Sequence, residues 1–396
     1  MKKYESLHVE GKRERLEYDL LDNKKDLRPG SLKRDRMTRC GMLVLLLSCA
    51  SSLLIGTAIG VHIVYTKSLG YLKARPVSSS GQLFDTKFLV VGDFGMGGTL
   101  QSSGDFGTAK EIQERIAKEM AYVGVVLQPD FVVSTGDNIY GGMKDKADPA
   151  YNETFLSVYQ GYPSLSQVNW YSVLGEQDYG SRNDKADGMA ESSPLYQMTA
   201  LNEENLAKNW VCCGGRRESF SVKQHKSLDL YFLDTSPFIH KYLNKPWASY
   251  PGGILSEQSK LQAQLDMLES HLEQSTAPWK VVVGHHPILS NGVNGNTAEL
   301  QQLRSIFKRH KVNLYLNGHD LVLQDIEEDK KSGLHYVTSG SGALPQDLQT
   351  GLCCNKAKFF EAVPGFVTVS VAQHEVRVQF WGEKAKLLHE YELKRS

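Results

Sequence analysis

Five short apolar segments of this 396-residue chain are each followed, with at most two residues between, by a glycine and then by an acidic residue or a histidine. An apolar run of about four to eight residues that is bounded by turn residues is typical of a buried strand. Glycine lets the backbone turn sharply where such a strand ends. In open α/β sheets, ligand sites collect beyond the carboxyl ends of the strands. We therefore expect these five chain segments to meet at one site: Gly92-Asp93, Gly136-Asp137, Gly175-Glu176, Gly284-His285 and Gly318-His319.

Helical patterns alternate with the strands. Thr108 and Glu111 have the spacing of a capping box, and apolar residues follow at steps of three and four up to Val123. Residues 261–272 and 300–310 repeat the helical pattern, whereas the chain from about 334 onward is rich in strands. Alternating helices and strands predict α/β layers, and the strand-rich end adds antiparallel pairing. The expected strands are 87–91, 131–133, 170–174, 228–233, 279–283, 312–316, 334–337, 366–371 and 376–381.

The N-terminal part of the chain has a different character. Residues 41–65 contain no Asp, Glu, Lys or Arg over 25 positions, and about 20 helical residues suffice to cross a bilayer. Four basic residues and a single acid lie between Lys33 and Arg39. Because positive charge stays in the cytosol, we expect a single-pass type II membrane protein. Its predicted parts are a cytosolic tail (1–40), a signal anchor (41–65), a stalk (66–86) and a luminal or extracellular domain (87–396).

Two features of this region have alternative interpretations. Ser48-Cys49-Ala50 has small residues at the spacing of a signal-peptide cleavage site, but the charged leader is long and the apolar stretch continues beyond Ala50, which favours an uncleaved anchor. In the tail, Tyr4-Glu5-Ser6-Leu7 and Tyr18-Asp19-Leu20-Leu21 resemble the signals that endocytic adaptors bind, although such short patterns also occur in tails that are simply solvated.

Cysteines and a glycosylation sequon agree with an exported domain. Cys212-Cys213 and Cys353-Cys354 are two adjacent pairs. A disulfide between neighbouring residues closes a strained ring, so we expect bridges between the two pairs, with four free or buried thiols as the alternative. Asn152 begins the sequence Asn-Glu-Thr, which is a sequon for N-glycosylation.

Charge and composition exclude one class of partner. Lys and Arg total 45 and so do Asp and Glu, which leaves no net charge to attract a nucleic acid. Hydrophobic residues make up 41% of the chain, which is enough for a folded core and argues against a disordered protein. The expected partners are the membrane and either a phosphomonoester or another protein, and the phosphomonoester follows from the resemblance described next.

The five motifs resemble those of the purple acid phosphatases, within the calcineurin-like metallophosphoesterases. Tyr140, Leu233-Asp234-Thr235 and the segment 338–342 extend the resemblance, above all to the small tartrate-resistant members, so that it spans about residues 85–393. Membership implies a four-layer sandwich of two mixed β-sheets flanked by helices. It also implies phosphomonoester hydrolysis at a two-metal site, in which iron is paired with iron, zinc or manganese.

The resemblance assigns metal-binding roles to five residues. Asp93 would bind the first metal together with the phenolate of Tyr140. Asp137 would bridge both metals, and His285 and His319 would bind the second. Each of these residue types matches the motif of the family at its position.

Four positions depart from the family pattern. Glu176 stands where the family has a metal-binding Asn, and Gln177 stands where it has a His that protonates the leaving group or contacts phosphate. Leu321 replaces a His ligand of the first metal, and Asn294 falls at a substrate-side His. His286 differs from many relatives, and we assign it no role.

These changes predict an unequal metal centre. Asp137, Glu176, His285 and His319 leave the second metal four donors, and the added charge favours a divalent ion. The first metal loses the donor at Leu321, so one site is expected to be intact and the other weakened. General-acid help, typically worth about 10²–10⁴-fold in rate, is missing. The chain is therefore predicted to be either a slowed or altered phosphatase, or a catalytically degenerate scaffold, membrane anchor or receptor.

Overall fold

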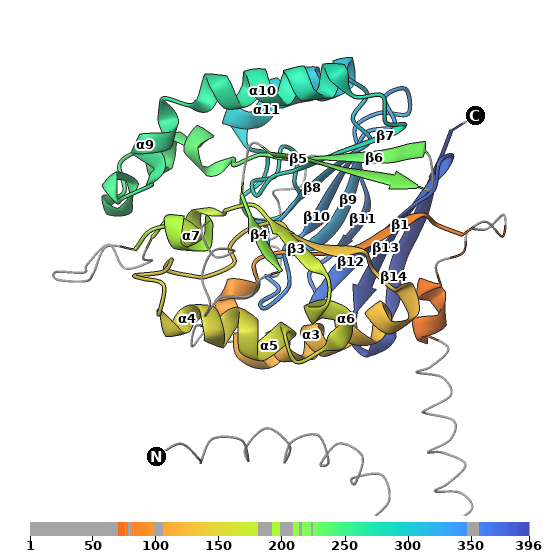
Figure 1. Ribbon diagram of the computed structural model, residues 1–396, viewed down its shortest axis with the longest axis horizontal. Coiled ribbons are helices and arrows are strands. Elements are labelled where there is room, and N and C mark those ends of the chain that lie inside the picture. Colours follow the sequence, from red (N-terminus) through yellow and green to blue (C-terminus); the bar gives the residue numbers. More distant parts are fainter. Residues whose placement is uncertain are drawn as a thin grey trace, which may run out of the picture. The chain divides into compact units, whose positions relative to one another are not determined.

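Two mixed β-sheets form the centre of the described chain (Figure 1). The first has the strand order β14-β13-β12-β1-β2-β3-β4, and the second has the order β11-β9-β10-β8-β7-β6-β5. The strands of the first sheet are β1 (Thr86–Val91), β2 (Phe131–Ser134), β3 (Asn169–Ser172), β4 (Trp210–Cys212), β12 (Gly365–Val371), β13 (Glu375–Gly382) and β14 (Leu387–Lys394). Those of the second are β5 (Arg216–Val222), β6 (His225–Phe232), β7 (Trp279–Val283), β8 (Leu314–Asn317), β9 (Leu323–Glu327), β10 (His335–Ser339) and β11 (Ala357–Glu361).

Parallel strands form one side of the first sheet, as far as its edge strand β4, and the middle of the second sheet. In the first sheet, β1 to β4 are parallel, and β12 pairs with β1 in the antiparallel sense, followed by β13 and β14. In the second, β6, β7, β8 and β10 are parallel, whereas β5, β9 and β11 pair antiparallel. This arrangement confirms the prediction of α/β layers with antiparallel pairing from the strand-rich end.

Helices cover the outer faces of both sheets (Figure 1). The longest, α3, begins with the predicted capping box: Thr108 Oγ1 accepts from the backbone N–H of Glu111, whose carboxylate accepts from the N–H of Thr108. Helices α3 to α6 lie on the first sheet, and α10 and α11 lie on the second. The helices are α3 (Ala109–Leu127), α4 (Pro149–Tyr151), α5 (Ser157–Tyr159), α6 (Pro163–Ser166), α7 (Glu176–Tyr179), α8 (Leu195–Met198), α9 (Ile254–Gln258), α10 (Leu261–Gln274) and α11 (Gln301–Arg309).

The continuous apolar runs of the central strands follow from this layering. Phe88 and Val90 of β1 lie in the core between the two sheets, whereas Leu89 and Val91 pack in the core beneath α3. Successive side chains of a strand point to opposite faces, so a strand that is covered on both faces must be apolar at every position. The result is the expected order of helix, sheet, sheet and helix.

The structure is a computed structural model, and it describes residues 70–75, 77, 81, 83–98, 106–180, 192–198, 209–213, 216–222, 225–346 and 356–395. These residues belong to one compact unit, Ile63–Ser396. The predicted tail (1–40) and signal anchor (41–65) lie outside the described residues. Within the described ranges, no helix is both long and apolar enough to cross a bilayer.

Part of the segment predicted to be a stalk (66–86) packs against the domain. Ala74, in the short 3₁₀ helix η2 (Leu72–Ala74), is fully buried in the core beneath α3. The carbonyl of Lys73 accepts a hydrogen bond from Gln379 at 3.0 Å, and the carbonyl of Val77 accepts one from Arg377 at 3.0 Å. These backbone contacts with β13 make the segment part of the domain.

Candidate metal centre

The five predicted chain segments meet beyond the carboxyl ends of β1, β2 and β3 in one sheet and β7 and β8 in the other. Two of the glycines are required by close approach. A Cβ at Gly175 would overlap Oδ1 of Asp137, and a Cβ at Gly318 would overlap Oδ2 of Asp93. Each glycine therefore makes room for an acidic side chain from another motif. The convergence predicted from the sequence is confirmed.

Three of the predicted ligands adopt left-handed backbone conformations. The φ angles are 58° at Asp93, 54° at Asp137 and 65° at His319. A residue with a side chain adopts this region at a cost of about 1–3 kcal/mol, and such residues cluster at functional sites. Backbone donors also point into the centre: the N–H of His319 donates to Asp93 Oδ2 at 2.9 Å, and the N–H of Gln177, in α7, donates to Asp137 Oδ1 at 2.9 Å.

Glu176 lies at the middle of a cluster of imidazoles. Its Oε2 is 3.0 Å from His285 Nε2, 3.2 Å from His319 Nδ1 and 3.4 Å from His286 Nε2. Donor atoms around a tetrahedral ion with bonds of about 2.0–2.1 Å are separated by roughly 3.3 Å. The spacing and chemistry of this group therefore fit a divalent metal ion.

The charges at the centre point to the same requirement for a cation. Burial raises the pKa of Asp93 and Asp137 well above the ordinary range, and Asp93 Oδ1 has no hydrogen-bond partner among the described residues. Burial also acts to raise the pKa of Glu176, but the surrounding imidazoles outweigh it and hold that pKa well below its ordinary value. Buried carboxylates of this kind are normally paired or bound to metal.

His285 is oriented as a metal ligand. Its Nδ1 lies 2.8 Å from the carbonyl oxygen of Thr135, which can only accept, so Nδ1 carries a proton. The lone pair of the neutral ring is then on Nε2, which lies 3.6 Å from Asp137 Oδ1 as well as close to Glu176. Metal-ligating histidines commonly have their other nitrogen bonded to a carbonyl in this way.

His286 is a residue of the centre that sequence reasoning missed. Thr235 Oγ1 already accepts the backbone N–H groups of His285 and His286, so its own proton is left to donate to His286 Nδ1 at 2.9 Å. The proton of the neutral ring then lies on Nε2, which is 3.0 Å from the hydroxyl of Tyr242 and 3.4 Å from Glu176 Oε2. His286 thus donates a hydrogen bond toward Glu176 and does not act as a further metal ligand. The one signal in the sequence is the adjacent pair of histidines.

The opposite half of the centre has an apolar side chain in place of a donor. Leu321 is buried, and it packs in a small cluster with Met96, Ala109 and Ala343. The ring of Tyr140 is half-buried against this cluster. Asp93, Asp137 and Tyr140 remain as candidate donors of the first metal position, and ligand atoms of Asp93, Asp137 and His285 lie within 4.8 Å of one another.

A cavity of about 410 Å³ opens over the centre. Its lining includes Gln177, Asn294 and Leu321, which are three of the four positions that depart from the family pattern, and the fourth, Glu176, also lines it. Asn294 is held there by Asp320, whose Oδ1 accepts from the backbone N–H and the side-chain amide of Asn294, each at 2.9 Å. The structure therefore places all four substitutions at one cavity.

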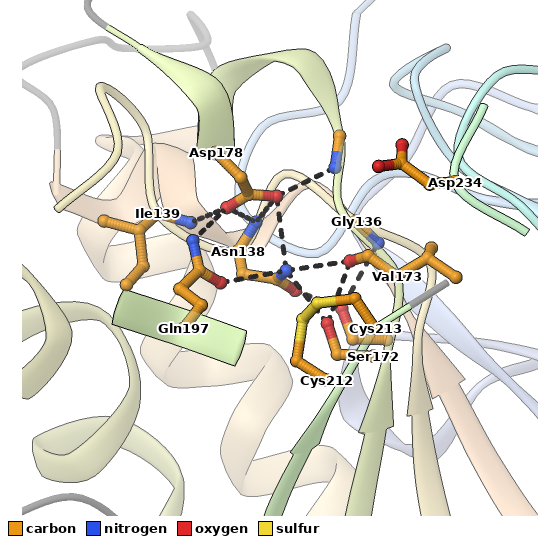
Figure 2. The surroundings of a disulfide bond; sticks show 12 residues. Gly136, Asn138, Ile139, Ser172, Val173, Asp178, Gln197, Cys212, Cys213 and Asp234 are labelled. Carbon is orange, nitrogen blue, oxygen red and sulfur yellow. Dashed lines mark hydrogen bonds between the residues drawn. A yellow bond between two sulfur atoms is a disulfide. The ribbon is translucent and has the colours of Figure 1, made fainter. Parts of the chain in front are cut away.

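A buried carboxylate fixes two of the motifs to each other (Figure 2). Asp178 Oδ1 accepts the backbone N–H groups of Asn138 at 2.9 Å and Ile139 at 2.8 Å. Its Oδ2 accepts the N–H of Gly175 at 2.8 Å, and Gln197 adds a side-chain donor to Oδ1 at 2.9 Å. Asp178 therefore sets the position of the loop that carries Asp137 relative to the loop that carries Glu176.

The cysteines near this network are bonded to each other, which corrects the expected cross-bridge. Figure 2 shows the disulfide between Cys212 and Cys213. Cys212 is the last residue of β4, so Cys213 is released from the strand alternation that would send the two side chains to opposite faces. Cys353 and Cys354 lie outside the described residues.

The predicted glycosylation site has a mixed environment. Asn152 is exposed, as a glycosylated residue must be. Thr154 of the same sequon is buried, and its hydroxyl donates to the carbonyl of Ala150 at 2.6 Å. A glycan would therefore have to be added before this segment folds, and glycosylation stays a prediction.

Comparison with known proteins agrees with this geometry. The family model for calcineurin-like phosphoesterases matches residues 86–323. Purple acid phosphatase 4 from Arabidopsis thaliana is 35% identical over 323 residues, which cover 77% of this chain and 82% of that protein. The chain belongs to the calcineurin-like phosphoesterases and is of the purple acid phosphatase type. Human tartrate-resistant acid phosphatase type 5 is 27% identical over 339 residues, which cover 81% of this chain and 94% of that protein.

Solved structures support the fold of this purple-acid-phosphatase-like chain. GAP50, the anchor in the inner membrane complex of Plasmodium, aligns with a TM-score of 0.62 at 21% identity, over 78% of this chain and 89% of its own. Purple acid phosphatase PPD1 from yellow lupin aligns with a TM-score of 0.50 at 12% identity, over 78% and 54%. At these identities the likeness shows the fold alone. The family uses dimetal centres, and the described residues contain two groups that could hold a metal ion: Glu176, His285, His286 and His319 form one, and Asp93, Asp137 and His285 form the other.

Proposed function

We propose that this chain is a membrane-anchored metalloprotein that holds one divalent metal ion and hydrolyses phosphomonoesters slowly. The observation that carries the proposal is the contrast within the centre. Glu176, His285 and His319 converge beside Asp137 on one side, whereas Leu321 occupies the corresponding donor position on the other. Iron, zinc and manganese all suit such a mixed set of nitrogen and oxygen donors.

The residues around the cavity have separate tasks in this proposal. A bound divalent ion would supply positive charge that polarises a phosphate oxygen. Asp137, Glu176, His285 and His319 would hold that ion. The amide of Gln177 can donate a hydrogen bond to a phosphate in the cavity but has no titratable proton to give to a leaving group.

Two lysines at the cavity add positive charge that the metal ligands do not provide. Lys241 and Lys245 both line the cavity together with Gln177. They would attract an anionic ester and offset part of the negative charge of the carboxylates. Among the described lining residues, His319 is the one imidazole, and its role as a ligand leaves no histidine for acid catalysis. The cavity thus contains groups that can bind a phosphate ester but no histidine that could act as the general acid in its hydrolysis.

The membrane part of the proposal comes from residues 41–65 and the basic residues that precede them. The domain would lie on the luminal or extracellular side, at the cell surface or in the endolysosomal system, and the tyrosine-based motifs of the tail would recruit endocytic adaptors. A protease added to sealed cells or vesicles should then reach a C-terminal tag only from the non-cytosolic side.

A second function, as a catalytically degenerate scaffold or membrane anchor with a protein partner, has its own support. Leu321 makes apolar contacts and cannot coordinate a metal, although it stands at the position of a histidine ligand that two-metal catalysis in this family needs. GAP50 shares the fold and is an anchor in a membrane complex. In this case the metal would stabilise the domain without supporting a reaction.

One experiment separates these outcomes. The full chain is purified in detergent, its metal content is measured by elemental analysis, and hydrolysis of p-nitrophenyl phosphate is followed at acid pH. One ion per chain with slow turnover that is lost in His319→Ala supports the proposal. One ion without turnover favours the scaffold. Two ions with rapid turnover would overturn both the single-metal centre and the degenerate site.

A further inference from the structure

One surface of the domain exposes large apolar side chains close to the point where the described chain begins. Val125 and Tyr122, on the outer side of α3, are 67% and 41% exposed, and Leu72 of η2 is 37% exposed. The segments are joined there: the Tyr71 ring lies 5.5 Å from that of Tyr122, and the Tyr71 hydroxyl donates to Glu119 at 2.7 Å.

Basic side chains accompany these apolar groups. Lys73 of η2 and Lys118 of α3 are both exposed, and Lys118 Nζ is 5.9 Å from the centroid of the Tyr122 ring. The exposed acids of the same helix, Glu111 and Glu114, lie nearer its N-terminal end. We call Leu72, Lys73, Lys118, Tyr122 and Val125 the α3–η2 face. Its mixture of aromatic, aliphatic and basic groups is typical of surfaces at a membrane interface.

We propose that the α3–η2 face rests on the headgroup region of the bilayer, with Val125 and Leu72 entering the interface. This inference rests on the membrane-anchored part of the proposed function. The chain length supports it: four residues, 66–69, separate the predicted anchor from Gly70. Because each residue spans at most about 3.6 Å, Gly70 can lie no farther than roughly 18 Å from the end of the anchor.

Because η2 packs against α3, the short connection to the anchor also limits how far α3 can lie from the membrane. Gly70 directly precedes Tyr71, which is fixed to α3 by its ring contact and its hydrogen bond with Glu119. The headgroup layer on each side of a bilayer is itself roughly 5–7 Å thick. The C-terminal half of α3 is therefore held near the lipid surface, and lysines there would be attracted to anionic lipids.

The inferred orientation points the metal centre away from the lipid. The N-terminal end of α3 follows the loop after Asp93, and its C-terminal end leads back to β2 near the start of β1, where the N–H of Asp130 donates to the carbonyl of Lys87. A helix of this length spans about 28 Å. The cavity, at the carboxyl ends of the strands, would thus open toward the lumen or exterior, where an ester or a protein partner can reach it.

Tryptophan reporters test the inference in the full chain. Val125→Trp and, as a second reporter, Tyr122→Trp are placed on the α3–η2 face. The matched control is Leu255→Trp, because Leu255 is 47% exposed on α9, which packs with the other sheet. Each chain is reconstituted into phosphatidylcholine–phosphatidylserine vesicles with and without brominated acyl chains, and flotation with the vesicles is measured separately. Emission is compared with that of the unsubstituted chain.

We expect the added emission of Val125→Trp and Tyr122→Trp to be lost in brominated vesicles and that of Leu255→Trp to be unchanged. Replacing Lys118 by Glu in the Val125→Trp chain should reduce the loss. If the chain floats but brominated vesicles reduce the emission equally at all three positions, the inference is overturned while the anchor stays intact. A chain that does not float overturns the anchor and the inference together. If the tryptophan of Val125→Trp is shielded from water equally in detergent and in vesicles, protein rather than lipid covers the face, and the inference is overturned.

Discussion

The two halves of the metal centre are built from the same kind of backbone turn but contain different side chains. Asp93 and His319 each follow a glycine at the end of a strand, and both have positive φ angles of similar size. On the His319 side, the turn leads into a cluster of imidazoles around Glu176. On the Asp93 side, the neighbouring donor position is occupied by Leu321, which is packed among apolar groups.

This difference shows that the fold and the chemistry of such a centre are separable. Replacing one imidazole by Leu321 preserves close packing, because the side chain finds Met96 and Ala343 as neighbours. What is lost is a donor for a cation beside Asp93, whose Oδ1 has no protein partner among the described residues. We therefore expect substitutions on the Glu176 side to lower the metal content and a restored donor on the Asp93 side to raise it.

The largest effect is expected from removing a ligand on the Glu176 side. His319→Ala should reduce the bound metal from about one ion per chain to almost none, because tight sites usually need three or four oriented donors. Asp93→Asn, which keeps an acceptor for the N–H of His319, should change the metal content little. Elemental analysis of both variants after gel filtration measures the contrast, and equal losses would remove the distinction between the halves.

Restoring the family residues should make the halves alike. Leu321→His, Gln177→His and Glu176→Asn together are expected to introduce a second metal ion and to raise phosphatase turnover by about 10²–10⁴-fold, the usual contribution of general-acid help. The comparison is with Leu321→His alone, which should add metal without the full gain in rate. If the triple variant folds and binds two ions but stays as slow as the parent, the missing histidines are not what limits turnover.

A third test concerns Asp234, a buried carboxyl that contacts the helix carrying Glu176. Burial raises the pKa of Asp234 to about 7, and Asp234 accepts the hydroxyl proton of Tyr179, at the end of the helix that begins with Glu176. The folded chain then binds a proton more tightly than the unfolded chain does, so stability should fall as pH rises from about 4 to about 7.

Asp234→Asn should flatten that dependence and raise the free energy of unfolding at pH 8 by up to about 4 kcal/mol. Denaturant unfolding in detergent at several pH values measures it. Asp266→Asn, at an exposed position of α10, is the matched control. A pH dependence that is the same in Asp234→Asn and in the parent would show that this carboxyl is not the group responsible.

The smallest effect concerns the residue that orients His286. Thr235→Val removes the hydroxyl that donates to His286 Nδ1, which should weaken metal binding by about 10–100-fold, as other losses of outer hydrogen bonds do. Thr235→Ser keeps the hydroxyl and should bind nearly as tightly as the parent. Titration with zinc against a chelating indicator measures the three affinities. Equal affinities for the Val and Ser variants would count against the role of this donor.

Much of the centre could be read from residue types alone. Asp, Glu and His after glycine at the ends of apolar runs predicted which side chains converge, and Leu321 marked the half that lacks a donor, because the identity of a donor is a local chemical fact. The central strands were predictable for a similar reason. A strand covered on both faces must be apolar throughout, as the run ending at Val91 is.

The tertiary structure decided what depends on direction and on partners. Beyond the end of β7, side chains no longer alternate, so the adjacent His285 and His286 both reach Glu176, and the hydroxyl of Thr235 sets the role of the second. Asp178 became important only through backbone groups of another loop. Strands β4, β5, β9, β11 and β14 were missed because mixed or short sequences take up strand structure when a neighbour supplies the hydrogen bonds, and pairing of that kind is invisible in one segment of sequence.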